Sequence, residues 1–283
     1  MRRVAVVTDS SASLPTDLAR DLGIRVVPIM LVLNGHTFHD GVDISPGELY
    51  SLLRNTKHSP TTSAPSIGDF LRVYAAAAET ASGIVSIHMS QKLSATYTSA
   101  RAASQLVDDL PIKVLDSRTA AMAQGFVVLE AARAAAGGAD LETVVARAQA
   151  VASRVHLLAT IGTLEYLHRG GRIGGAATLL GTALQIKPVL YLADGHVDVF
   201  ARPRTQSKAT RVMLRQISQQ ADGRPLHVAI FHADALGQAE ELRTKIAQEF
   251  HCVELYVTEM TPVMGAHTGP GVLGVVFYAD EQN

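Results

Sequence analysis

The stretch GIVSIHMSQKLSATYTSARAASQLVDDLPIKVLDS, residues 83–117, decides the fold class of this 283-residue chain. Short apolar runs at 83–90 and 112–117 are typical of strands, and the pattern between them is typical of a helix. A strand, a helix and a second strand of this length form a βαβ unit, in which the two strands run parallel. The stretch therefore predicts an α/β protein.

The same alternation extends through the first half of the chain. Residues 4–8 predict a strand, and residues 14–23 predict a helix with Pro15 in its first turn and Gly23 at its end. From residue 156 the pattern changes, and Asp194-Gly195 between two alternating segments predicts a hairpin. We expect a parallel-sheet, Rossmann-like domain over residues 1–155 and a mixed α/β domain over residues 156–283.

Composition limits the function classes. The chain is 47% hydrophobic, carries a net charge of -1 and has no Trp, which argues against nucleic acid as its main partner. Cys252 is the single cysteine, so a disulfide within the chain and a cysteine-based zinc site are both excluded. The first apolar run ends at Thr8-Asp9, too early for a signal peptide, and no stretch is long enough to span a bilayer. We expect a soluble, cytoplasmic protein.

Hydroxyl side chains follow the predicted strands of the first half. In an open parallel sheet, ligands bind outside the carboxyl ends of the strands. This end of the sheet is rich in hydroxyls and poor in charge, which suits a carboxylate better than a polyphosphate. Ser, Thr and Asp are also favoured helix caps, which is the alternative explanation. The residues after strands are Thr8, Asp9, Ser10, Ser11, Ser13, Ser90, Ser94, Thr96, Tyr97, Asp116, Ser117 and Thr119. The segment SPTTSAPS, residues 59–66, which we expect to be a loop, adds Thr61, Thr62, Ser63 and Ser66.

Two glycine-rich segments need an explanation. Gly269, Gly271 and Gly274 have the spacing of a dinucleotide-binding motif, but they lead into an apolar, β-branched strand instead of a helix, so we expect no dinucleotide. We place His267 in the loop before them, as a ligand contact or a structural imidazole. The segment RGGRIGG, residues 169–175, could form an anion-binding turn with Arg169 and Arg172 or a simple tight turn.

Enzymatic alternatives have weaker motifs. Asp116, Ser94 or Ser117, and His267 could supply a hydrolase triad, although no G-x-S-x-G elbow is present. A serine-type hydrolase of acyl esters that uses Ser94 and His267 stays the alternative function. No spacing indicates a metal site, since His227 and His232 would lie on different faces of a strand.

Six motifs together resemble the DegV family of bacterial fatty-acid-binding proteins, also called FakB. They follow the family's order over nearly the whole chain, with Ala64 where Gln is frequent and Ala95 where Gly is frequent. They are VVTDSSASLP (6–15), TTSAPS (61–66), LSATYTSA (93–100), VLDSRTAAMAQG (114–125), LEYLHRGGRI (164–173) and GAHTGPGVLGVVFY (265–278).

The resemblance implies a two-domain fold with a fatty acid buried between the domains and no other cofactor. It implies that Thr62, Ser94 and His267 bind the carboxylate, with Ala95 and Thr268 beside them. It further implies a non-enzymatic carrier with no catalytic residue of its own. The carrier presents its acid to a separate ATP-dependent kinase of the DAK type, which makes acyl phosphate for phospholipid synthesis. Arg204 and Arg172 would face the kinase or the new phosphate.

Overall fold

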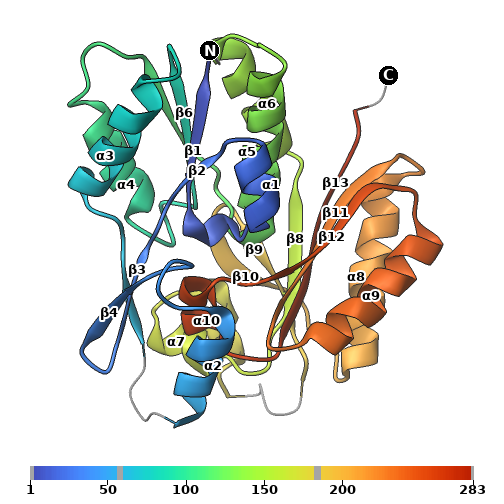
Figure 1. The fold of residues 1–283 in the computed structure, drawn as a ribbon. Helices are drawn as coiled ribbons and strands as arrows, with labels where there is room; N and C mark the ends of the chain where they lie inside the picture. The colour runs from blue at the N-terminus through green and yellow to red at the C-terminus, as the bar shows by residue number, and fades with distance from the viewer. Residues whose placement is uncertain (1–2, 56–59, 182–185, 282–283) are drawn as a thin grey trace.

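The computed structural model describes residues 3–55, 60–181 and 186–281, and these residues fold around two main sheets (Figure 1). The first sheet has the strand order β2-β1-β6-β7, and each of its neighbouring strands pairs in parallel. Its strands are β1 (Ala5–Asp9), β2 (Arg25–Val27), β6 (Ile84–His88) and β7 (Ile112–Asp116). The predicted βαβ unit is confirmed, because α4 (Thr96–Ser104) connects the neighbouring parallel strands β6 and β7.

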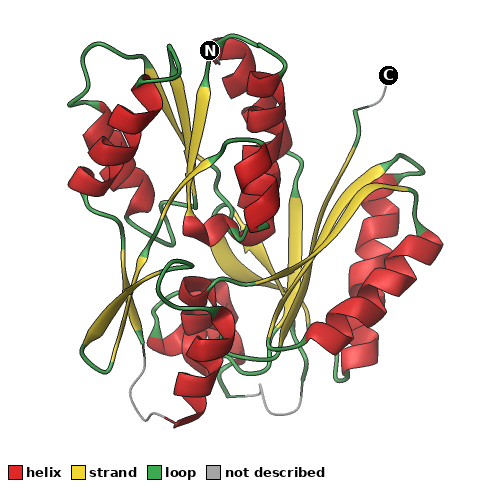
Figure 2. Ribbon diagram, viewed as in Figure 1, coloured by secondary structure: helices red, strands yellow, loops and turns green. Residues whose placement is uncertain are grey.

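Helices cover both faces of this sheet, as its sequence pattern requires. On one face lie α3 (Ile67–Ala78) and α4, and on the other lie α5 (Ala121–Ala136) and α6 (Leu141–Ala152) (Figure 2). Successive strand residues point to opposite faces, so Val6 packs toward α5 while its neighbour Val7 packs toward α3.

The second sheet is mixed and has the order β10-β9-β8-β13-β11-β12. Only β11 and β12 pair in parallel, and each of the other neighbouring pairs is antiparallel. Its strands are β8 (His156–Thr160), β9 (Val189–Ala193), β10 (His196–Ala201), β11 (Leu226–Ala233), β12 (Cys252–Glu259) and β13 (Val272–Ala279). Two helices, α8 (Gln206–Ala221) and α9 (Leu236–Glu249), cover its outer face (Figure 1).

The predicted hairpin at Asp194-Gly195 is confirmed. It joins β9 to β10, and both of its residues have positive φ angles, 48° and 86°, as a type I′ turn needs. The two main sheets use residues from separate parts of the chain, 5–116 and 156–279. The domain boundary between residues 155 and 156 stays a prediction.

Helix α5 packs against both sheets. It contacts β1 and β6 of the first sheet and β11 and β13 of the second. Its sequence AMAQGFVVLEAARAAA is apolar on almost every side, and twelve of its sixteen residues are buried. A helix that is apolar all round belongs in the interior, so the largest hydrophobic cluster contains residues from both sheets.

A small third sheet was not predicted. It has the order β4-β3-β5, formed by β3 (Met30–Leu33), β4 (His36–His39) and β5 (Thr61–Ser63). The expectation that residues 61–63 form a loop is therefore wrong, since they pair with β3. Three residues are too few to show the alternation that identifies a strand.

Short helices complete the fold. Among the described residues, no helix is long and apolar enough to cross a membrane. The remaining helical elements are η1 (Ser10–Ala12), α1 (Thr16–Asp21), α2 (Pro46–Asn55), α7 (Glu165–Arg169), η2 (Gly174–Leu179) and α10 (Pro262–Thr268).

Candidate ligand site

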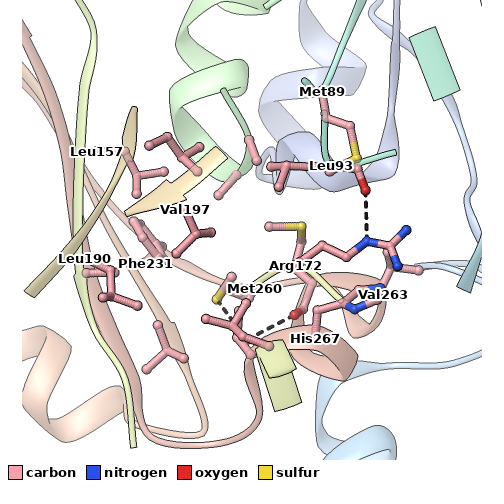
Figure 3. Close-up of a pocket in the computed structure, with 18 of the residues that line it drawn as sticks. Met89, Leu93, Leu157, Arg172, Leu190, Val197, Phe231, Met260, Val263 and His267 are labelled. Atoms are coloured by element: carbon pink, nitrogen blue, oxygen red, sulfur yellow. Dashed lines mark hydrogen bonds between the residues drawn. The ribbon is translucent and has the colours of Figure 1, made fainter. Parts of the chain in front are cut away.

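A cavity lies where the first sheet, the second sheet and α10 meet. Most of its walls are aliphatic or methionine side chains contributed by many separate elements of the chain. Figure 3 shows this apolar part, whose lining residues include Met89, Leu157, Leu190, Val197, Phe231 and Met260. An interior space of this kind suits a ligand with a long hydrocarbon portion.

Polar side chains line one side of the cavity. In Figure 3, Arg172 and His267 lie together on the side opposite Leu157, Leu190 and Phe231. Five residues that the sequence analysis named as site residues line this one cavity: Thr62, Ser94, Arg172, His267 and Thr268. The structure thus brings together side chains from four separate segments, since His267 and Thr268 are neighbours in α10.

The Thr62 hydroxyl and the His267 imidazole form the central contact of the polar side. Thr62 Oγ1 lies 2.8 Å from His267 Nε2, and the tautomer decides which atom donates. The placement of His267 in a loop is wrong, because it is the penultimate residue of α10. The helix ends at Gly269, whose φ of 71° and closeness to the Tyr166 ring both require glycine.

The site holds a neutral imidazole next to a cation. Burial lowers the pKa of His267 to about 4, and the positive charge of Arg172 acts in the same direction. Arg172 donates from Nε to the carbonyl of Leu93 at 3.0 Å and from Nη1 to the carbonyl of Gly170 at 2.6 Å. No carboxylate of the described residues forms an ion pair with this guanidinium, so its charge is available to an anionic ligand.

This cation corrects the expectation of a site poor in charge. The hydroxyls after the first strand lie elsewhere: Thr8, Asp9 and Ser11 are fully buried and do not line the cavity. Asp9 Oδ2 lies 2.9 Å from His88 Nδ1 and accepts a hydrogen bond from Gln124 Nε2 at 3.1 Å. These side chains join β1, β6 and α5, so they stabilise the fold and are closed to a ligand.

The hydrogen bonds of Ser94 do not form a hydrolase pair. Ser94 Oγ lies 2.8 Å from Thr96 Oγ1, and in the described part of the chain no hydrogen bond connects Ser94 to His267. The charged neighbour of the imidazole is Arg172, whereas a Ser-His-Asp triad needs a carboxylate there. The geometry gives no support to the alternative of a serine-type hydrolase.

Two predicted residues lie outside the cavity lining. Ala95 is exposed and precedes the first residue of α4. Arg204 is exposed in the segment between β10 and α8. Their predicted roles toward the carboxylate and the kinase stay predictions.

Several lining residues were not identified from the sequence. They include Met260, Val263 and Met264 around α10, as well as Tyr191 and Val197 of the β9–β10 hairpin. No periodic pattern links these residues, because some come from the segment 260–264 and the others from two strands of the hairpin. Gly170 was also missed as a packing position, since a Cβ there would collide with His267 Nδ1. In the described ranges, no group of three or more potential ligand side chains could hold a metal ion.

The chain is similar to known proteins over almost its whole length. Residues 3–280 match the model of a family described as "Uncharacterised protein, DegV family COG1307". A DegV domain-containing protein of Mycobacterium tuberculosis is 38% identical, with 96% of each chain covered. One from Halalkalibacterium halodurans is 33% identical over 99% of this chain and 100% of its own.

Solved structures show the same fold. A DegV family protein from Thermus thermophilus, described by its fatty acid binding, has a TM-score of 0.94 and 37% identity over 99% of this chain and 100% of that one. DegV from Bacillus subtilis, described as a fatty acid binding protein, has a TM-score of 0.92 and 28% identity over the same shares. The match of the family model to almost every residue shows that this chain belongs to the DegV family.

Proposed function

We propose that this protein binds a long-chain fatty acid, with the acyl chain in the apolar cavity and the carboxylate at its polar side. The observation that carries this proposal is the position of Thr62, His267 and Arg172 on one side of a mostly apolar cavity. The fatty acid binding described for the Thermus and Bacillus proteins supports the same assignment.

The energetics of the cavity favour this class of ligand. Burial of about 14 methylenes at about 0.8 kcal/mol each contributes on the order of 11 kcal/mol before entropy costs. The head group contributes selectivity, because hydroxyls, a neutral imidazole and one guanidinium can all donate hydrogen bonds to a carboxylate. A fatty alcohol or methyl ester of equal length would keep the burial energy of the acyl chain. It would lose most of the hydrogen bonds to the head group.

We further propose that the protein acts as a carrier for a separate ATP-dependent kinase. In this reaction a carboxylate oxygen attacks the γ-phosphorus of ATP, the bond to ADP breaks, and the product is an acyl phosphate. In this reaction Arg172, which lines the cavity, would stabilise the charge of the added phosphate. The exposed Arg204 is available to contact the kinase. The use of ATP makes the cytoplasm the proposed site of action.

The test begins with the protein as purified. Native mass spectrometry should show a bound acid of 14 to 18 carbons, and delipidated protein should take up oleate in calorimetry. Methyl oleate is the matched control ligand and should bind more weakly. A protein that is empty as purified and also fails to bind oleate contradicts the proposal.

The carrier role needs a second measurement. With a fatty acid kinase and ATP, oleate bound to the protein should become oleoyl phosphate, while the protein alone should not turn over short acyl esters. Ester hydrolysis without the kinase would instead identify a hydrolase.

A further inference from the structure

Asp40 is a buried carboxylate away from the polar side of the cavity. It directly follows β4, is 2% exposed and does not line the cavity. Its Oδ1 accepts a hydrogen bond from the backbone N–H of Val263 at 2.9 Å. Its Oδ2 has no hydrogen-bond partner among the described residues. Because burial of a carboxylate without a cation is unfavourable, its presence needs an explanation beyond stability.

The bond from Val263 fixes the start of α10. Pro262 is the first residue of this helix and has no N–H, so Val263 provides the first free donor. Thr261, the residue just before the helix, makes no side-chain hydrogen bond that caps it. Asp40 therefore caps the helix from 223 residues away in the chain, and its charge suits the positive end of a helix.

The three-stranded sheet holds α10 at both ends. The backbone N–H of Asp40 donates to the carbonyl of Ile29 at 2.9 Å, just before β3, which pairs with both β4 and β5. Thr62 on β5 contacts His267 at the other end of α10. Residues 263 and 267 are about one helical turn apart, so a shift at the first attachment would move the imidazole at the second.

We propose that Asp40 is a positioning residue for His267. By fixing the start of α10, it holds the imidazole against Thr62 and toward the cavity. This inference rests on the proposed function, because its main measurement is the affinity for a fatty acid. It adds to that function a residue that contacts neither the cavity nor the ligand.

The test compares two substitutions of Asp40 with a matched control. Asp40→Ala removes the acceptor for the Val263 amide. Asp40→Asn keeps an oxygen acceptor, and because burial raises the pKa of Asp40, it also resembles the uncharged form. The control is Asp140→Ala, since Asp140 accepts a hydrogen bond from Thr143 N at 2.9 Å and caps α6, which does not line the cavity.

Two readouts separate positioning from stability. Calorimetry gives the Kd for oleate, and a long-range proton–nitrogen NMR spectrum gives the imidazole signals of His267, with His227 as a reference away from the cavity. We expect Asp40→Ala to raise the Kd by about tenfold, as misplaced binding groups do, and to shift the His267 signals alone. Asp40→Asn should bind like the unchanged protein, and Asp140→Ala should lower the Tm without changing the Kd.

Three results would overturn the inference. The first is an Asp40→Ala protein with unchanged Kd and unchanged His267 signals. The second is an Asp40→Asn protein that is folded but has lost its affinity for oleate. This result would overturn the inference even if the Asp40→Ala protein does not fold. The third is an equal rise in Kd for Asp140→Ala. If the unchanged protein itself does not bind oleate, the proposed function fails, and the NMR comparison still tests the position of His267.

Discussion

The hydroxyl oxygen of Thr62 lies 2.8 Å from Nε2 of His267, although the two residues are 205 positions apart in the chain. A hydroxyl and a neutral imidazole each carry one donor proton, so one proton forms this hydrogen bond and the other stays available to a ligand. Both residues line the cavity beside Arg172.

His267→Ala and Ser94→Ala should impair function more than folding. Each substitution removes a polar group from the side where we place the carboxylate. The rate of acyl-phosphate formation with the kinase should fall by about tenfold to a hundredfold, as expected when a polar group loses its partner. Thermal melts beside the assay provide the control. If the variants lose enough stability to explain the slower reaction, both residues have only a structural role.

Protonation of His267 should reduce the stability of the fold in mild acid. Burial, and then the charge of Arg172, lower the pKa of His267 to about 4, compared with 6.5 for a solvent-exposed imidazole. Between pH 6.5 and about 4 the unfolded chain therefore binds a proton that the folded chain does not, so stability falls as the pH is lowered. His267→Gln should remove up to about 3 kcal/mol of this loss.

The measurement for this pH prediction is urea unfolding of both proteins from pH 7.5 to 4. The other histidines contribute equally to the free energy of unfolding of both proteins, so their contribution cancels when the two values are subtracted. Two curves that stay parallel across this range would show that the His267 pKa is not lowered in the folded protein.

Gly170→Ala should disturb the imidazole directly. A Cβ at this position would collide with His267 Nδ1 and lie 3.1 Å from the carbonyl oxygen of Tyr166. Insertion of a methyl group into such a packed contact typically costs about 1–3 kcal/mol. We expect weaker binding of oleate and a lower Tm. Gly47→Ala is the matched control, because its Cβ meets open space. Equal affinities for the two variants would show that the imidazole can move away without consequence.

Gly274→Ala should change the preference for chain length. A Cβ on Gly274 would collide with the tip of the Phe231 ring, which lines the cavity on the side away from Arg172 and His267 (Figure 3). The displaced ring should shorten the space for the acyl chain. The Kd for an 18-carbon acid should therefore rise more than the Kd for a 14-carbon acid. An equal change in Kd for both acids would show that Phe231 lies beside the acyl chain and not at its end.

The regular parts of the fold were predictable, and the small sheet was not. The βαβ unit at 83–117 and the turn at Asp194-Gly195 have local signals that packing did not override. Strand β5 has only three residues, and its pairing with β3 depends on contacts that no local pattern records. The seven-residue helix α10 also lacks a clear local pattern. His267 was therefore expected in a loop, although α10 continues through Thr268.

The sequence by itself determined the fold class, because apolar periodicity and turn residues act over short distances. It also contains the motifs by which the chain resembles the DegV family. It also singled out Thr62, Ser94, Arg172 and His267 as site residues. Only the tertiary structure decided that these four line one cavity, and that Thr8 and Asp9 belong to a buried network instead. The capping of α10 by Asp40 likewise became visible only there. The physical reason is that both outcomes depend on how the sheets and α10 pack, which brings together residues far apart in the chain.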